Sequence, residues 1–202
     1  MTRPRAILVA AAALLAAALW WRKNPSACPY SQRFWVQAPH PIITRSRLRE
    51  VLEPAAGERI LEIGPGTGYY TPELAGWVGP GGAVEIFDIQ QEMLDHTMRA
   101  VEERGLGNVV PRQGDARALP YGEDSFDAVV LVTVLGEIPD PDLALAEIRR
   151  VLRPGGRLVV GELFGDPHFT TFESLCRRGI RAGLGPEERS GCWFGYFARL
   201  RA

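Results

Sequence analysis

The sequence predicts an α/β fold built on a mostly parallel sheet. Three observations support this prediction. Residues 59–63 form a short apolar segment typical of a buried parallel strand, and this segment leads directly into three alternate glycines in residues 64–68. A second apolar segment, residues 83–87, ends at Asp88. Helical and strand-like segments then alternate along the chain, which predicts a parallel sheet with right-handed crossovers.

The individual elements follow from local patterns. Apolar residues recur at helical spacing in residues 42–53, and residues 71–73 (Thr-Pro-Glu) supply a cap, a proline and an acid for another helix start. Further helices are expected at about residues 90–104, ending at Gly105, and at about 141–152; further strands are expected at about 108–113, 127–133, 157–163 and 193–199. A chain of 202 residues, 46% hydrophobic, fits one domain of this kind with an attachment.

The glycine turn and the acid twenty residues after Gly68 predict a nucleotide-cofactor site. In doubly wound folds the ligand lies at the carboxyl ends of the strands, where an acid such as Asp88 can accept hydrogen bonds from both ribose hydroxyls. In a dinucleotide motif the third glycine would stand at Tyr69, whose ring would crowd the helix and strand. Glu62 at the end of the strand suits a cationic ligand better than a pyrophosphate.

With Glu62-x-Gly64-x-Gly66-x-Gly68, the chain resembles the class I S-adenosylmethionine-dependent methyltransferases, whose first motif is an acid-x-G-x-G-x-G. The resemblance covers roughly residues 42–201, including the segments 114–116, 119–130 and 145–158, and is nearest to the branch with quinone and phospholipid methyltransferases. It implies a Rossmann-like sheet of seven strands with an antiparallel last strand, and S-adenosyl-L-methionine as cofactor.

The resemblance also implies roles for individual residues. Glu62 and the glycine turn would hold the methionine end, Asp88 the ribose and Asp115 the adenine amino group, while Thr133 would lie near the transferable methyl. The implied cofactor-binding residues are Glu62, Gly64, Gly66, Gly68, Asp88, Ile89, Asp115, Ala116 and Thr133. The simpler alternatives are that Asp88 only ends a strand or caps a helix, that Asp115 is a turn residue, and that Thr133 only fills a strand.

In-line methyl transfer needs mainly alignment and exclusion of water, so a catalytic base is not always required. A carbon acid or a hydroxyl acceptor would need a base, and His40, Tyr70 and Glu137 are the candidates. The alternatives are that His40 orients the linker and that Glu137 is an exposed loop acid. Trp35, Phe164 and Trp193 are candidate apolar walls of the acceptor site.

The N-terminus differs from the rest of the chain. Residues 6–21 carry no charge and would span about 24 Å as a helix, so residues 1–23 are expected to be a membrane anchor; a cleaved signal sequence is the alternative. Lipidation at Cys28 is disfavoured by Pro25. We expect a basic linker at residues 24–41 and the methyltransferase domain at 42–202.

Charge favours a cytoplasmic catalytic domain. Eight Lys or Arg and no acid occur before residue 50, and six of the eight follow the apolar run, as the positive-inside rule requires. The alternative is export after signal cleavage. The basic residues 22–49 would also lie well on anionic lipid, although a merely solvated linker is the simpler interpretation.

Other functional classes are disfavoured. Three cysteines and three histidines show no disulfide or zinc spacing, and the acidic remainder of the chain lacks a nucleic-acid footprint. The predicted function is methyl transfer to a small or lipid-like acceptor at the membrane surface. The rivals are a membrane-tethered protein that binds S-adenosylmethionine without catalysis, and an NAD-dependent oxidoreductase. The sequence does not give the acceptor or the oligomeric state.

Overall fold

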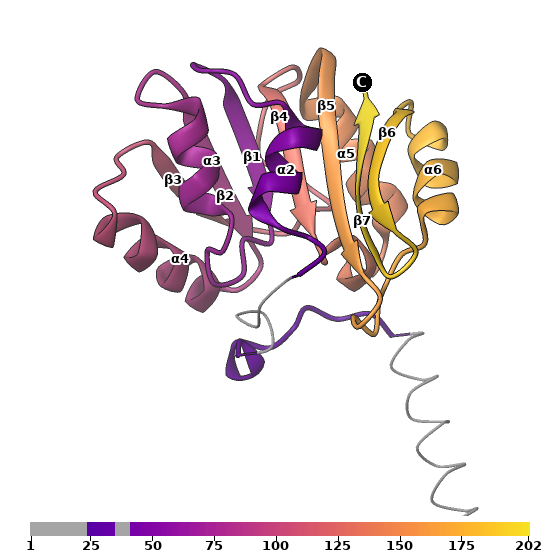
Figure 1. Ribbon diagram of the computed structural model, residues 1–202, viewed down its shortest axis with the longest axis horizontal. Helices are drawn as coiled ribbons and strands as arrows, with labels where there is room; N and C mark the ends of the chain where they lie inside the picture. The colour runs from indigo at the N-terminus through magenta and orange to yellow at the C-terminus, as the bar shows by residue number, and fades with distance from the viewer. Residues whose placement is uncertain (1–23, 35–40) are drawn as a thin grey trace, which may run out of the picture.

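The computed structural model describes residues 24–34 and 41–202; the predicted anchor, residues 1–23, and His40 lie outside the described residues. A twisted seven-stranded sheet forms the centre of the molecule, with helices on both faces (Figure 1). The strands are β1 (Arg59–Ile63), β2 (Ala83–Asp88), β3 (Val109–Gln113), β4 (Phe126–Val132), β5 (Leu152–Leu163), β6 (Gly185–Cys192) and β7 (Gly195–Arg201). The helices are α2 (Arg45–Leu52), α3 (Thr71–Val78), α4 (Gln91–Glu103), α5 (Pro141–Val151) and α6 (Phe172–Arg181), with short 3-10 turns η1 (Tyr30–Gln32) and η2 (Leu135–Glu137).

The strand order is β3-β2-β1-β4-β5-β7-β6, and the expected Rossmann-like sheet is confirmed. Strands β1 to β5 run parallel, while β7 pairs antiparallel with both β5 and β6. The chain winds outward from β1 in one direction to β3 and in the other from β4 onward. The carboxyl ends of β1 and β4 therefore flank the topological switch point, where ligands bind in such sheets.

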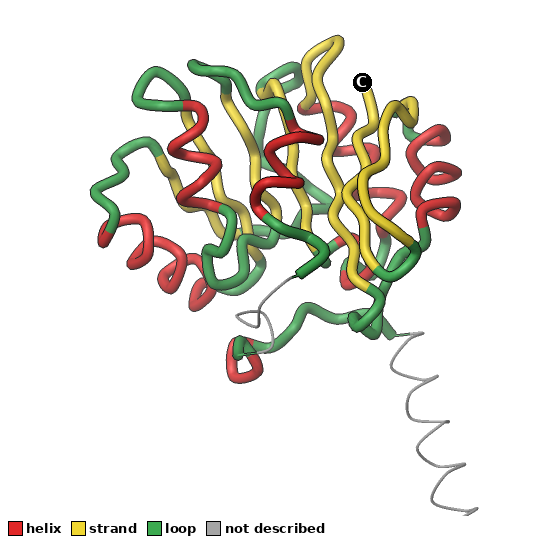
Figure 2. The backbone as a smooth tube through the Cα atoms, viewed as in Figure 1, coloured by secondary structure: helices red, strands yellow, loops and turns green. Residues whose placement is uncertain are grey.

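Two apolar cores hold the layers together. One lies between the sheet and helices α2, α3 and α4, and the other between the sheet and helices α5 and α6. The tube view shows the helices arranged around the strands (Figure 2). Among the described residues, no helix is both long enough and apolar enough to cross a bilayer.

Two elements fall outside the expected list of helices and strands. Strand β6 has the sequence Gly-Pro-Glu-Glu-Arg-Ser-Gly-Cys and lies largely exposed at the edge of the sheet, so no apolar alternation marks it. Helix α6 buries Leu175 and Gly179 and was also not expected, although Phe172, Leu175 and Gly179 recur at helical spacing. Strand β7 begins at Gly195, two residues later than expected.

The expected cap of α3 is corrected by the structure. The N-cap residue is Tyr70, without a side-chain cap bond, and Thr71 is the first residue of the helix. The Thr71 hydroxyl instead donates to Oε2 of Glu62 at 2.6 Å. The capping pattern was misleading because a buried carboxylate competes for the hydroxyl.

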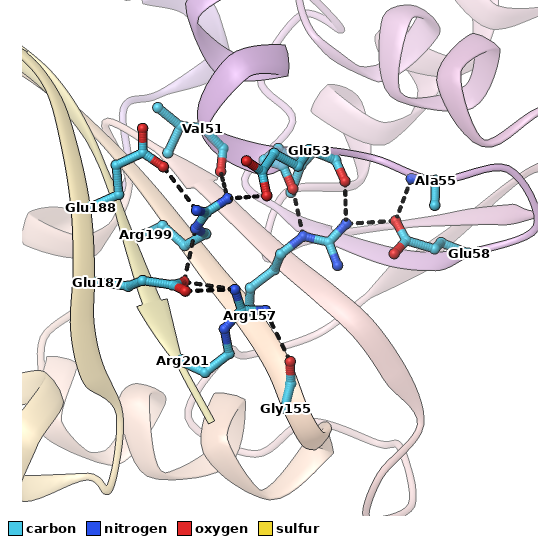
Figure 3. Close-up of polar contacts among 11 residues, drawn as sticks. Val51, Glu53, Ala55, Glu58, Gly155, Arg157, Glu187, Glu188, Arg199 and Arg201 are labelled. Carbon is cyan, nitrogen blue, oxygen red and sulfur yellow. Dashed lines mark hydrogen bonds and ion pairs between the residues drawn. The ribbon is translucent and has the colours of Figure 1, made fainter.

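An arginine network joins several elements at the end of the sheet opposite the glycine turn (Figure 3). The side chain of Arg199 on β7 is only 9% exposed and forms ion pairs with Glu53 at 2.7 Å and with Glu187 and Glu188 at 2.9 Å. It also donates to the carbonyl of Val51 at 2.9 Å. The network thus ties the end of α2 to the sheet beside the start of β1.

Candidate cofactor-binding site

A cavity of about 360 Å³ lies at the carboxyl ends of β1, β2 and β4. The predicted cofactor residues that line it are Gly64, Gly66, Asp88, Ile89, Asp115, Ala116 and Thr133. These residues come from four separate segments of the chain, and the parallel sheet brings them to one edge. Glu62 and Gly68 are outside the lining.

The three glycines of the turn stand at positions where a side chain would be strained. Gly64, Gly66 and Gly68 have φ of 68°, 59° and 77°, a region that side chains rarely adopt. A Cβ at Gly64 would collide with Val134, while one at Gly68 would press on Thr97 of α4. Gly64 therefore permits the close approach of Val134, which also lines the cavity, and Gly68 permits packing against α4.

Glu62 lies behind the turn, only 3% exposed, and accepts a hydrogen bond from Thr71. Burial raises the pKa of its carboxyl to about 7. Its contact with the methionine end of a cofactor remains a prediction. A cationic ligand held at the turn would favour the ionised carboxylate, so this buried acid fits a sulfonium or ammonium better than a phosphate.

Asp88 closes β2 and faces the cavity. Burial raises the pKa of its carboxyl to about 6, and its Oδ1 accepts a hydrogen bond from the backbone N–H of Gln90 at 2.9 Å. That bond braces the start of α4, so the carboxylate has the structural role considered above and also lines the site. An acid at the end of the second strand is suited to bind ribose hydroxyls.

Asp115 lines the cavity, yet its carboxylate is engaged within its own turn. Arg117 forms an ion pair with it at 2.6 Å, and the backbone N–H of Arg117 donates to Oδ1 at 2.9 Å. Asp115 thus stabilises its own turn, and a contact to adenine, which stays a prediction, would have to share this carboxylate. Arg117 also lines the cavity, and the sequence reasoning missed it. Ile89, 54% exposed, and the largely buried Ala116 offer apolar contacts to a ring.

Thr133 follows β4 and has φ of 54°. A β-branched residue in this region is a genuine outlier, and such backbone strain gathers at ligand sites. Its hydroxyl donates to the carbonyl of Val132 at 2.8 Å, and its N–H donates to the carbonyl of Gly161 at 2.8 Å. Thr133 is therefore not ordinary strand filler, and its place near a methyl group remains a prediction.

Residues 25–28, which we expected to be part of a linker, form one wall of the cavity. The side-chain amide of Gln90 makes two hydrogen bonds to this part of the chain. Its Nε2 donates to the carbonyl of Cys28 at 2.9 Å, and its Oε1 accepts from the N–H of Tyr30 at 3.0 Å. The N–H of Cys28 donates to Oε2 of Glu137 at 3.2 Å. These contacts join residues sixty or more positions apart, so local sequence patterns do not reveal them.

The candidate bases are placed very differently. Glu137 on η2 lines the cavity, and the pKa of its carboxyl rises to about 8, chiefly through burial and then through the negative charge of Asp166. Tyr70 is buried outside the lining; its hydroxyl donates to the carbonyl of Ile43, and burial raises its pKa far above the usual range. His40 lies outside the described residues. Of the two described candidates, Glu137 is the one at the site.

A second cavity of about 500 Å³ adjoins the first. Pro25, Ile138 and Pro139 line both. Its other lining residues include Phe169 and, at the start of α6, Thr171 and Ser174. This neighbour offers space for an acceptor beside the cofactor site. Of the suggested apolar walls, Phe164 and Trp193 line neither cavity and are exposed instead, and Trp35 lies outside the described residues.

Metal chemistry finds no support in the part of the chain that the structure describes. No group of three His, Cys, Asp or Glu side chains there is placed to hold a metal ion. Cys28, Cys176 and Cys192 are free thiols.

Comparisons with known proteins agree with this geometry. A family model described as a methyltransferase domain matches residues 60–156. The ubiquinone/menaquinone biosynthesis C-methyltransferase UbiE of Teredinibacter turnerae is 41% identical over 118 residues, which cover 58% of this chain and 47% of that protein. The chain thus spans less than half the length of this curated relative.

Solved structures share the fold. A SAM-dependent methyltransferase from Aquifex aeolicus superposes with a TM-score of 0.79 at 19% identity, covering 87% of this chain and 99% of that one. The [4+2]-cyclase SpnF superposes with a TM-score of 0.69 at 21% identity, covering 78% of each chain. At these identities the likeness concerns the fold alone. Together with the glycine turn and the acid after β2, the match of residues 60–156 to a methyltransferase domain, the 41% identical relative and the shared fold support a class I S-adenosylmethionine-dependent methyltransferase.

Proposed function

We propose that this protein transfers a methyl group from S-adenosylmethionine to a small or lipid-like acceptor at a membrane surface. The observation that carries the proposal is the pair of adjoining cavities at the switch point of the sheet. The first is lined by the glycine turn and Asp88, which fit a nucleoside with a cationic end. The second leaves room for an acceptor beside it.

Different residues of the first cavity would bind and align the cofactor. Bound S-adenosylmethionine would supply a methyl group on a positively charged sulfur. Asp88 would hold the ribose, Glu62 would add negative charge behind the turn, and Ile89 would contact the adenine. Residues 25–28 wall the cavity and exclude water, which in-line transfer requires.

Glu137 is the group able to remove a proton from the acceptor. With a pKa near 8 it is a stronger base than an ordinary carboxylate, and it lies in the cavity wall. A curated relative is named as a C-methyltransferase of quinone biosynthesis, and methylation at carbon requires loss of a proton from that carbon. The acceptor class that we favour is therefore a quinone-like ring, whose oxygen groups make the proton on the methylated carbon more acidic.

The membrane part of the proposal rests on the sequence. Residues 1–23 would anchor the chain and the basic residues 22–49 would lie near anionic lipid, with the catalytic domain in the cytoplasm. Protease protection of the full chain in sealed vesicles tests the orientation, and N-terminal sequencing tests the alternative of a cleaved signal followed by export.

Calorimetric titration of S-adenosylmethionine into the full chain in detergent tests the cofactor. We expect binding that Asp88→Asn weakens about tenfold or more, whereas the exposed Asp95→Asn on α4 leaves it unchanged. Binding of NAD in place of S-adenosylmethionine would favour the oxidoreductase.

A second candidate is binding of S-adenosylmethionine without methyl transfer. We retain this alternative because a protein named as a [4+2]-cyclase has a similar fold, and a shared fold does not fix the reaction. Incubation with methyl-labelled cofactor and membrane lipid extract separates the two: label in a lipid product supports the transferase, and tight binding without any labelled product supports the alternative.

A further inference from the structure

Three exposed aromatic side chains gather beside the second cavity. Phe164, Trp193 and Phe194 are 56%, 63% and 45% exposed, and we refer to them as the aromatic cluster. Trp193 and Phe194 stack with ring centroids 3.6 Å apart, and Phe164 lies 5.7 Å from Trp193 and 6.2 Å from Phe194. The N–H of Phe164 donates to the carbonyl of Phe194 at 2.7 Å, so the backbone fixes the cluster.

The cluster lies at the same edge of the sheet as both cavities. Phe164 directly follows β5, and Trp193 and Phe194 form the turn between β6 and β7, which meets the end of β5 (Figure 1). The ring of Phe169 lies 5.8 Å from that of Phe164 and lines the second cavity. The exposed rings are thus joined to the second cavity through one further ring.

The described chain also begins at this edge. Asn24 is its first residue, and Pro25 lines both cavities. Only two residues, both basic, separate Asn24 from the uncharged segment 6–21 that ends in two tryptophans. A bilayer that holds this segment would therefore face the side of the molecule that carries both cavities and the aromatic cluster.

We propose that the aromatic cluster is a lipid-contact surface that sets the second cavity against the bilayer. Tryptophan and phenylalanine are favoured where protein enters the membrane interface, because their rings bury apolar area there. This inference rests on the proposed membrane function and adds to it the face that meets lipid. It also implies that a lipid-like acceptor reaches the second cavity from the bilayer, past Phe164 and Phe169.

A second copy of the chain is the less suitable occupant. A stable protein interface needs about 800 Å² on each partner. Three rings on two adjoining turns supply much less, and of the other exposed apolar residues Val110, Leu143 and Ile180 lie on β3, α5 and α6 rather than beside the cluster.

The test uses the full chain in vesicles of phosphatidylcholine and phosphatidylglycerol. The exposed Cys192, next to Trp193, takes an environment-sensitive fluorophore after Cys28→Ser and Cys176→Ser. A control label goes on Gly81→Cys in a chain that also carries Cys192→Ser; position 81 is exposed, lies before β2 at the opposite edge, and a Cβ there meets no atom within 4 Å. Nitroxide-bearing lipids should quench the label at Cys192 at least about twofold more than the control label.

A double variant separates the cluster from the rest of the surface. Trp193→Ser with Phe194→Ser should lower quenching at Cys192 to the control level, while Ile180→Ser, whose parent side chain is also 63% exposed, should not. The affinity for S-adenosylmethionine should stay unchanged in both, which shows that the fold is intact.

Each outcome decides the inference. If the chain floats with vesicles but the Cys192 label is not quenched, the lipid-contact surface is wrong and the proposed membrane function stands. If the chain does not float, both fail. Energy transfer between labels of different chains in detergent would assign the cluster to a second copy and overturn the inference.

Discussion

The backbone N–H of Cys28 donates a hydrogen bond to Oε2 of Glu137 at 3.2 Å, joining residues 109 positions apart. Glu137 is the one described candidate base that lines the cavity, and Cys28 belongs to the wall formed by residues 25–28. The same contact therefore fixes the carboxylate and holds the wall in place. In the proposed mechanism, this contact would couple the exclusion of water to the removal of a proton by Glu137.

Gln90 should control release of the cofactor. Its amide makes two hydrogen bonds to the wall segment, each worth about 1 kcal/mol, so Gln90→Ala should raise the dissociation rate of S-adenosylmethionine about tenfold or more. The neighbouring Gln91→Ala is the control, because the Gln91 side chain bonds only to Asp95 of its own helix among the contacts seen. Stopped-flow measurements giving equal rates for the two variants would remove this role.

Glu137 should make stability depend on pH. Its folded-state pKa near 8 exceeds the ordinary value of 4.5, so its protonated form favours folding at low pH, and stability is lost as pH rises from about 4.5 to 8. Glu137→Gln should be more stable than the parent by up to about 4 kcal/mol at pH 9 and equal to it near pH 4. Urea unfolding of both proteins at the two pH values checks this.

Methyl transfer to a carbon acceptor should fall at least about a hundredfold in the Glu137→Gln variant, because glutamine cannot accept the proton.

Asp88 should make cofactor binding sensitive to acid. Its pKa near 6 in the free protein means that lowering the pH below 6 protonates the carboxylate that would hold the ribose. We expect the Kd of S-adenosylmethionine to be constant above pH 8 and to rise by up to about tenfold per unit below pH 6. Calorimetry across this range, repeated on Asp88→Asn, assigns the effect. A slope that persists in the variant with a midpoint near 7 belongs to Glu62 instead.

Gly64 should tolerate no side chain. In Gly64→Ala the methyl group would collide with Val134 and stand at a positive φ, so cofactor binding should be lost. Gly105→Ala is a matched control, because Gly105 has a similar φ of 65° but nothing within 4 Å of its Cβ. Both variants should lose about 1 kcal/mol of stability from the backbone. Only the variant at Gly64 should lose affinity, and normal affinity there would contradict the placement of the turn.

Arg199 should matter for stability and not for binding. Arg199→Ala removes a largely buried guanidinium and leaves the carbonyl of Val51 without this donor, which should cost about 2 kcal/mol. Arg181→Ala, whose side chain is 59% exposed and pairs with Asp142, should cost less than about 0.5 kcal/mol. Thermal unfolding compares the two, and an unaltered melting temperature for Arg199→Ala would show that the network is dispensable.

Much of the fold was predictable because its signals are local. Buried parallel strands such as β4 are almost wholly apolar, and a glycine turn followed at a distance by an acid identifies the edge where a nucleoside binds. Strand β6 was not predicted from the sequence because an exposed edge strand needs no apolar pattern. The Thr71 cap was wrong because Glu62, nine positions earlier, takes the hydroxyl.

The sequence by itself determined the fold class, the cofactor class and the segments that meet at the switch point, because each depends on residues close together in the chain. Only the tertiary structure decided that Gly68 packs against α4, that Arg117 engages Asp115, and that Cys28 and Gln90 wall the cavity around Glu137. The reason is physical: burial and hydrogen bonding between distant segments depend on how the sheet aligns them, and no local pattern encodes that alignment.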